Sequence, residues 1–159
     1  MSAAEIAVVV EEPLWRHEGR AFLTDLRRTI RAALKRTEKK SEAGLTVLLA
    51  GDSKLEELNR RHRGKAKPTN VLSFPSADDD YLGDIAIAYG VTAREAREAG
   101  KSIHDHALHL AVHGALHLLG YDHETARQAR IMEPLETAIL AEFGIADPYA
   151  TRPQAATPH

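Results

Sequence analysis

Three histidines in the second half of the chain have the spacing of a metal site. His113 and His117 stand four residues apart inside an apolar run, residues 107–119, that predicts one helix. Residues four apart lie on the same helical face, so both imidazoles can reach one ion. His123 follows ten residues after His113, and on a straight helix it would lie about 15 Å away. That distance is far beyond a zinc–nitrogen bond of about 2.0–2.1 Å.

Gly120 removes this obstacle. It falls where helices commonly end in a left-handed residue, so the chain can turn back and present His123 as a third ligand. Three histidine ligands leave one tetrahedral position open, which is typical of a catalytic rather than a structural zinc ion. The alternative is a core helix with histidines on its polar flank. The spacing of His113 and His117 alone does not decide between the two interpretations. Gly120 together with His123 favours the metal site.

Residues 60–67 form a second candidate site, because five of the eight are Lys or Arg in a chain whose net charge is −2. These five are Arg60, Arg61, Arg63, Lys65 and Lys67. Helix C-termini favour positive residues, which would explain the first two. The charges that continue beyond Gly64 need another reason. Guanidinium groups bind two phosphate oxygens at once, so we expect a loop that faces phosphate.

Length and composition predict one catalytic domain, residues 1–147, followed by a disordered tail, residues 148–159, rich in Pro, Ala and Thr. The absence of cysteine excludes a Cys-based zinc finger, a thiol nucleophile and a disulfide scaffold. The chain start lacks the pattern of a signal peptide, and no apolar run approaches the roughly 20 residues that span a bilayer. We therefore expect a cytoplasmic protein with no membrane partner. The slightly negative charge argues against coating nucleic acid over the whole surface.

The hydrophobic pattern predicts a small sheet with helices packed on it. Strands are expected at 6–10, 45–50, 71–74 and 83–88, and helices at 20–37, 54–61, 93–100, 107–119 and 124–143. Thr92 with Glu95 predicts a capping box, and Pro134 predicts a kink or a new start in the last helix. The basic residues of helix 20–37 are expected to form only its solvated face. The mixed order of elements indicates an α+β fold, with a four-stranded mixed sheet and about five helices.

Three segments together resemble one protein family. Residues 113–123, His-Gly-x-Leu-His-Leu-x-Gly-Tyr-Asp-His, are similar to the signature of the YbeY family of bacterial endoribonucleases and rRNA maturation factors. Residues 63–75, Arg-Gly-Lys-x-Lys-Pro-Thr-Asn-Val-Leu-Ser-Phe-Pro, resemble that family's other characteristic block, and Gly83-Asp84-Ile85 matches as well. The likeness runs from about residue 59 to residue 140.

This resemblance implies a zinc-dependent, single-strand-specific endoribonuclease, that is, a hydrolase of RNA phosphodiester bonds with a zinc-hydrolase-like fold. Its role would be small-subunit rRNA 3′-end maturation and ribosome quality control. It implies that His113, His117 and His123 bind one Zn²⁺ per chain and that Arg63 is the catalytic arginine facing the RNA. It also implies contacts with the small ribosomal subunit, including a ribosomal protein and an assembly GTPase.

Other polar residues are expected to support this site. The basic residues Arg60, Arg61, Lys65 and Lys67 would follow the RNA backbone with little sequence preference. Asp122 would hold the tautomer of a ligand or the turn. His109, one turn before His113, would either line the cleft or be structural. His104 and His106 are interpreted as surface residues.

The same ligand spacing occurs in metzincin proteases, which carry Glu directly after the first histidine as the general base. Gly114 occupies that position here and cannot move a proton. Peptide hydrolysis therefore lacks its key group. The ribonuclease hypothesis also has no obvious base, and either zinc-bound hydroxide or the RNA 2′-OH could be the nucleophile. The alternatives are a non-catalytic ribosome-assembly factor with a structural zinc and, less favoured, another metallohydrolase.

Overall fold

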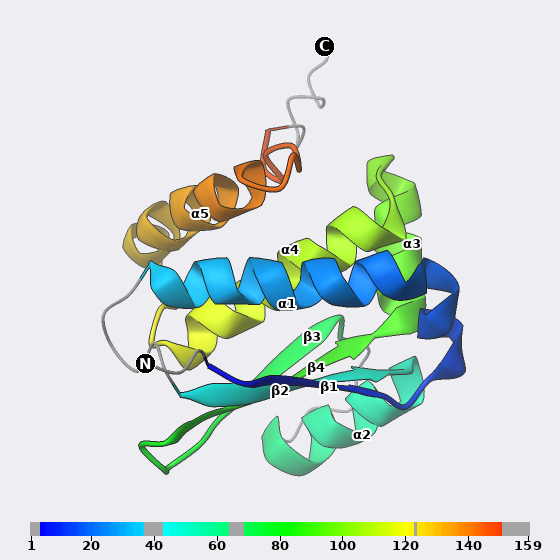
Figure 1. Ribbon diagram of the computed structural model, residues 1–159, viewed down its shortest axis with the longest axis horizontal. Coiled ribbons are helices and arrows are strands. Elements are labelled where there is room, and N and C mark those ends of the chain that lie inside the picture. Colours follow the sequence, from blue (N-terminus) through cyan, green and yellow to red (C-terminus); the bar gives the residue numbers. More distant parts are fainter. Residues whose placement is uncertain (1–3, 37–42, 64–68, 123, 151–159) are drawn as a thin grey trace.

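The computed structural model describes residues 4–36, 43–63, 69–122 and 124–150 of the chain. Figure 1 shows the elements in their order along the chain. They are β1 (Ile6–Val10), η1 (Pro13–Glu18), α1 (Gly19–Lys35), β2 (Gly44–Ala50), α2 (Asp52–Arg63), β3 (Val71–Pro75), β4 (Tyr81–Ala88), α3 (Tyr89–Ala99), α4 (Ile103–Leu118) and α5 (Ala126–Ala141). The short 3₁₀ helix η1 was not predicted.

The four strands form one mixed sheet in the order β1-β2-β4-β3. The strand pairs β1–β2 and β2–β4 are parallel, and β3 runs antiparallel to β4. Parallel neighbours need a crossover connection, which α1 supplies between β1 and β2. The predicted α+β class, with a four-stranded mixed sheet and about five helices, is confirmed.

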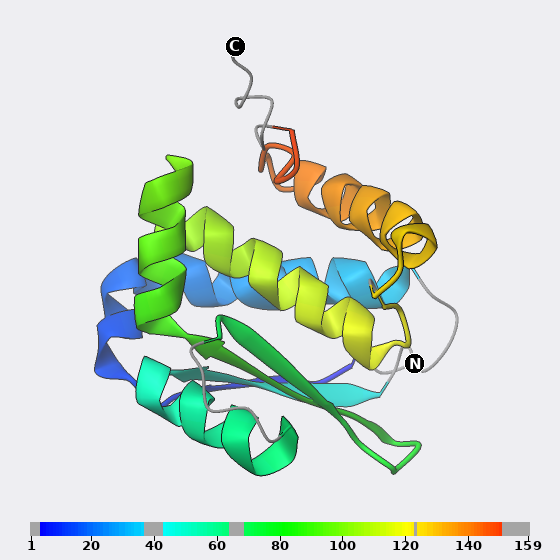
Figure 2. The ribbon, with the colours of Figure 1, turned by 180° about the vertical axis from the view of Figure 1, so that it is seen from behind.

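Helices cover both faces of this sheet. Helices α1 and α4 lie on one face and α2 lies on the other, as the two opposite views show (Figures 1 and 2). Alternate side chains of a strand point to opposite faces. Ile85 and Ile87 of β4 therefore join the core under α1 and α4, whereas Ala86 and Ala88 pack with Leu55 of α2. Within the described residues, no helix combines the length and the apolar character needed to cross a membrane.

Helix α4 is the central helix, and it contacts α1, α3, α5, β3 and β4. Its N-terminus is capped by the Ser102 hydroxyl, which accepts a hydrogen bond of 3.0 Å from the amide of Asp105. Gly114 lets the helix lie directly on the sheet. A Cβ atom there would come within 2.9 Å of Cγ2 of Ile85 and 3.1 Å of Oγ of Ser73. The Ser73 hydroxyl also donates to the Gly114 carbonyl at 3.2 Å.

The start of α3 differs from the prediction. Thr92 lies inside the helix, where it is buried and its hydroxyl donates to the Ala88 carbonyl at 2.6 Å. The expected cap at Thr92 is therefore wrong, because Ala88 is the N-cap residue. Glu95 does not close a capping box and instead accepts a hydrogen bond of 3.0 Å from the Asn70 side chain.

The C-terminal region also differs in detail. Helix α5 runs through Pro134 without a new start, so the kink expected as the alternative stays a prediction. Its capping box is formed by Thr125 and Gln128. Residues 148–150, which were assigned to the tail, form a turn in the structure. Residues 151–159 lie outside the described part of the chain.

Candidate metal centre

Helix α4 presents three half-buried histidines on one face, because residues three or four apart stack on successive turns. His109, His113 and His117 follow one another along this face, with ring-centroid distances of 6.4 Å and 4.6 Å. The Nε2 atoms of His113 and His117 point toward each other and lie 3.1 Å apart. The structure thus brings together the nitrogens of the two predicted ligands on α4.

The chain turns directly after these residues. Helix α4 ends at Leu118, and Gly120 has a φ of +104°, a conformation that glycine adopts without the penalty that other residues meet. The amide of Gly120 donates to the His117 carbonyl at 3.0 Å. The expected left-handed turn is confirmed. Asp122 follows in a half-buried position, and its supporting role stays a prediction. His123 lies outside the described residues, so its place also stays a prediction.

Glu136 of α5 is a central residue that sequence reasoning missed. Its side chain is 0 % exposed and accepts hydrogen bonds from Nδ1 of His113 at 2.6 Å and from Nε2 of His109 at 2.9 Å. The hydroxyl of Tyr149 donates to the same carboxylate. The sequence could have indicated this residue, because Glu136 lies on the apolar face of α5 in line with Met132 and Ile139. An acidic side chain on such a face is buried and therefore needs polar partners.

The environment of Glu136 holds it in its charged form. Burial alone would raise the pKa of this carboxyl group, but the hydrogen bonds from His109 and His113 outweigh it and lower the pKa to about 2. Burial lowers the pKa of His109, and the bond to Glu136 offsets this only in part. Near neutral pH an ionised carboxylate therefore anchors Nδ1–H of His113.

The two histidines fit a zinc ion. Histidines that bind metals usually donate their other ring N–H to a carboxylate or carbonyl group, which fixes the tautomer and the ring orientation. His113 makes this bond to Glu136, and its Nε2 faces Nε2 of His117. In a tetrahedral zinc site, two nitrogens at about 2.0–2.1 Å from the ion lie about 3.3 Å apart, close to the separation observed here. Among residues 4–36, 43–63, 69–122 and 124–150, no three acidic, His or Cys side chains are grouped to hold a metal. The predicted third donor, His123, lies outside these ranges, and its role stays a prediction.

The basic segment is only partly described. Arg63 is the last residue of α2, and its side chain lies outside the described part. Arg60 and Arg61 are exposed, and Arg61 lies 3.8 Å from Glu57 in an ion pair. Lys65 and Lys67 are not described. Helices α2 and α4 lie on opposite faces of the sheet, and both C-terminal ends point toward the same side of the molecule (Figure 2). The roles of these basic residues stay predictions.

Two other histidines of α4 are not the surface residues that we expected. His106 is 8 % exposed, and its Nε2 donates to Glu95 at 2.9 Å. His104 is half-buried between Asp25 at 2.9 Å and Asp105 at 3.1 Å. The interpretation of His106 as a surface residue is wrong, because its position on α4 faces the neighbouring helix α3. Neither side chain bonds to Glu136.

Comparison with known proteins gives the family. A family model described as Endoribonuclease YbeY matches residues 15–144. A Rhodopseudomonas palustris protein named Endoribonuclease YbeY is 49 % identical over 151 residues, covering 90 % of this chain and 80 % of the relative. A Maricaulis maris protein of the same name is 40 % identical, covering 97 % of each. The solution structure of TM1509 from Thermotoga maritima has a TM-score of 0.61 at 26 % identity, covering 88 % of this chain and 92 % of that one. The chain belongs to the YbeY endoribonuclease family.

Proposed function

We propose that this protein is a zinc-dependent, single-strand-specific endoribonuclease that acts in small-subunit rRNA 3′-end maturation and ribosome quality control. Its relatives bear the name endoribonuclease, which supports an RNA substrate. The observation that carries the proposal is the pair of Nε2 atoms of His113 and His117, 3.1 Å apart, with a buried carboxylate on the far side of one ring.

His113, His117 and His123 would hold the metal ion. A bound zinc ion would supply a dipositive Lewis acid beside the scissile phosphate. Glu136 fixes the orientation and the tautomer of His113 through the bond to Nδ1. Nε2 of His113 therefore faces His117. Tyr149 and His109 in turn hold the Glu136 carboxylate in place. This network prepares the site before any substrate arrives.

The basic residues would handle the negative charge of the RNA. Arg63 would neutralise charge that builds on the phosphoryl oxygens in the transition state, where a guanidinium fork binds two oxygens at once. Arg60, Arg61, Lys65 and Lys67 would follow the backbone without reading the bases, which gives affinity with little sequence preference. The ribosomal protein and the GTPase are further proposed partners.

The position of Gly114 argues against peptide hydrolysis. In the metzincin pattern this position carries a glutamate that acts as general base. Here the Cβ direction of residue 114 points at Ile85 and Ser73 in the sheet. A side chain at this position would meet the core instead of reaching the histidine nitrogens. The fold therefore has no room for the protease base at the place where that class carries it.

The test is cleavage of one labelled RNA sequence as a single strand and as a duplex by zinc-loaded protein. We expect internal cleavage of the single strand only, with losses of about 100-fold or more in His117→Ala and Arg63→Ala, as for removal of a charge-stabilising group. Arg97→Ala, an exposed residue of α3, is the control and should cleave normally. Wild-type rates in metal-free His117→Ala would contradict the proposal. A zinc-loaded wild type that cleaves no RNA but still supports rRNA maturation in cells would favour the assembly-factor alternative.

A further inference from the structure

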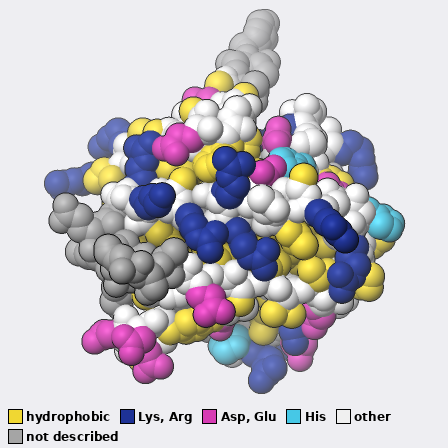
Figure 3. Space-filling model, viewed as in Figure 1, with side chains coloured by type: hydrophobic (Ala, Val, Ile, Leu, Met, Phe, Trp, Pro, Cys, Tyr) yellow, Lys and Arg dark blue, Asp and Glu magenta, His cyan; other side chains and the backbone are white. Residues whose placement is uncertain are grey.

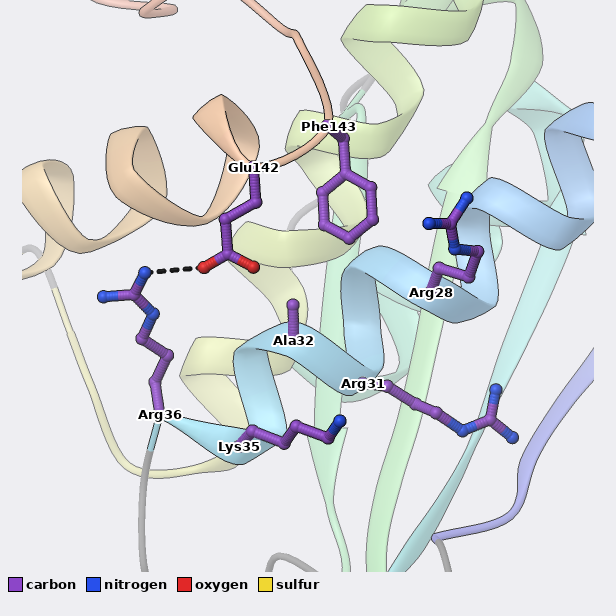
Figure 4. Close-up of a pocket in the computed structure, with 7 residues that line it drawn as sticks. All are labelled: Arg28, Arg31, Ala32, Lys35, Arg36, Glu142 and Phe143. Atoms are coloured by element: carbon purple, nitrogen blue, oxygen red, sulfur yellow. Dashed lines mark hydrogen bonds and ion pairs between the residues drawn. The ribbon is translucent and has the colours of Figure 1, made fainter.

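A groove lies between the C-terminal half of α1 and the residues that follow α5 (Figure 4). Its volume is about 430 Å³. It is lined by Arg28, Arg31, Ala32, Lys35, Arg36, Glu142 and Phe143. We call it the α1–α5 groove. None of these residues belongs to the histidine cluster. In the space-filling view, Lys and Arg side chains gather across the middle of the same face, where α1 lies in Figure 1 (Figure 3).

The α1–α5 groove is strongly positive for this chain. Four of its residues are Lys or Arg and one is Glu, so its net charge is 4 − 1 = +3, whereas the whole chain carries −2. Arg31 and Lys35 stand four apart on α1, and like charges at that spacing destabilise a helix. A face that is merely solvated does not need this repulsion. The concentration of charge therefore points to an anionic ligand.

Local contacts hold the guanidinium groups around the groove. Arg36 lies 2.6 Å from Glu142 in an ion pair that joins α1 to the end of α5. The Arg28 guanidinium lies 5.4 Å from the centroid of the Phe143 ring. Arg31 donates to the Ala4 carbonyl at 3.5 Å. In Figure 4, the side chains of Arg31 and Lys35 extend from α1 in the same direction. A pre-positioned guanidinium loses less entropy when it binds a phosphate.

The shape of this surface suits a chain of phosphates better than a single small anion. Arg28 and Arg36 are eight residues apart, which is about 12 Å along the axis of α1. Successive phosphates of a stacked strand are about 3.4 Å apart along its axis, so several can lie along this row. The groove is open and cationic along its length, with only Ala32 and Phe143 as apolar lining residues. It therefore lacks the cluster of apolar anchors typical of protein interfaces.

We infer that the α1–α5 groove binds the phosphate backbone of RNA at a site separate from the histidine cluster. The inference rests on the proposed function, because it assigns to the same RNA substrate a second contact. Two separate contacts on one strand reinforce each other, so a long RNA would bind more tightly than a short one. Short oligonucleotides would reach only the metal centre.

The test uses zinc-loaded protein and the double variant Arg31→Gln/Lys35→Gln, which spares the Arg36–Glu142 ion pair. Arg97→Gln/Arg130→Gln is the matched control, because it also removes two positive charges and both residues are exposed on other helices. Affinity for a long single-stranded RNA is derived from the KM of cleavage and from fluorescence anisotropy across a salt series. A second comparison uses an oligonucleotide of about 6 nucleotides, near the lower end of known single-strand site sizes.

Each single-strand phosphate contact contributes a slope of about −0.7 in log affinity against log salt. Loss of two contacts should reduce the slope by about 1.4 and weaken long-RNA binding about tenfold near 0.15 M salt. Cleavage of the short oligonucleotide should not change. The charge-preserving variant Arg31→Lys/Lys35→Arg should bind long RNA like the wild type, and melting curves should show all variants folded.

Several results would overturn the inference. Unchanged long-RNA affinity, or an equal loss in the control variant, would show that the groove makes no specific contact. A loss that extends to the short oligonucleotide would place these residues at the cleavage site instead. Intact RNA binding with lost association to a ribosomal protein would assign the groove to an acidic protein surface. If the wild type neither binds nor cleaves RNA, the proposed function itself fails. If the wild type does both and the groove variant behaves like the wild type, the groove inference alone fails.

Discussion

Replacing Glu136 with glutamine should weaken zinc binding, although Glu136 is not itself a proposed ligand. The glutamine keeps the size of the side chain but removes its charge. The wild-type carboxylate accepts two histidine N–H groups, from His109 at 2.9 Å and from His113 at 2.6 Å. A glutamine has one acceptor oxygen, and its amide NH₂ cannot accept the second. The single oxygen cannot accept from both histidines, and a neutral amide holds Nδ1–H of His113 less strongly than the carboxylate does.

The expected size of this effect follows from the contact that is lost. Changing the carboxylate partner of a metal-binding histidine typically lowers metal affinity by about 10- to 100-fold. At about 1.4 kcal/mol per tenfold change, this corresponds to about 1.4–2.8 kcal/mol. Glu136→Asp should also weaken binding, because the shorter side chain cannot reach both histidines. Glu98→Gln, in an exposed position on α3, removes the same charge and serves as the control.

Zinc affinity is measured by titrating metal-free protein against a chromophoric chelator at pH 7.5, below the melting temperature of every variant. Melting curves of the metal-free variants report separately on stability, which we expect to fall by about 1–3 kcal/mol because a buried polar group loses a partner. A zinc affinity of folded Glu136→Gln within twofold of the wild type would refute the argument that this carboxylate prepares the metal site.

Three further predictions concern the backbone and the pH response. Gly120→Ala places alanine in the left-handed region, which should cost about 1–2 kcal/mol in urea unfolding and also lower zinc affinity. Gly100→Ala is the control, because Gly100 also has a positive φ but lies at the end of α3, away from His113 and His117. It should cost similar stability and leave zinc affinity unchanged. Equal zinc affinities of the two variants would contradict a role of the Gly120 turn in zinc binding. Gly114→Ala should cost up to about 2 kcal/mol, since overpacking costs about 1–3 kcal/mol and helix propensity returns about 1; a variant more stable than the wild type would be contrary evidence. Burial alone would lower the pKa of His104, but hydrogen bonds with two aspartates raise the pKa above its ordinary value. The stabilisation that protonated His104 gives the folded state is therefore complete below about pH 6.5 and is lost as the pH rises through the folded pKa. Between about pH 6 and about pH 8.5, the unfolding free energy of the metal-free wild type should fall by more than that of His104→Gln. Equal losses would disprove this coupling.

Local spacing predicted the parts of the site that lie on one element. The separation of His113 and His117 determines that they share a helical face, and it needs no knowledge of the rest of the fold. Gly120 was identified for the same reason, since a helix that ends there needs a left-handed residue. The strands were found from short apolar runs, and their pairing into one mixed sheet followed the expected class.

Contacts between distant elements could not be predicted in the same way. Periodicity shows that Met132, Glu136 and Ile139 share one face of α5, but it does not show that this face meets the histidines of α4. Tyr149 lies in a segment whose composition suggested disorder, and only its contact with Glu136 reveals its part in the site. Thr92 resembled a cap because capping patterns also occur inside helices that begin earlier.

We propose that three histidines hold one zinc ion and that RNA cleavage depends on this ion. The most direct measurement restores zinc stepwise to metal-free protein and follows bound zinc and single-stranded RNA cleavage in the same samples. We expect the cleavage rate to rise in proportion to bound zinc and to stop rising at one zinc per chain. The His113→Ala variant should bind little zinc and gain no activity. Full cleavage by metal-free wild type, or by His113→Ala without zinc, would contradict it.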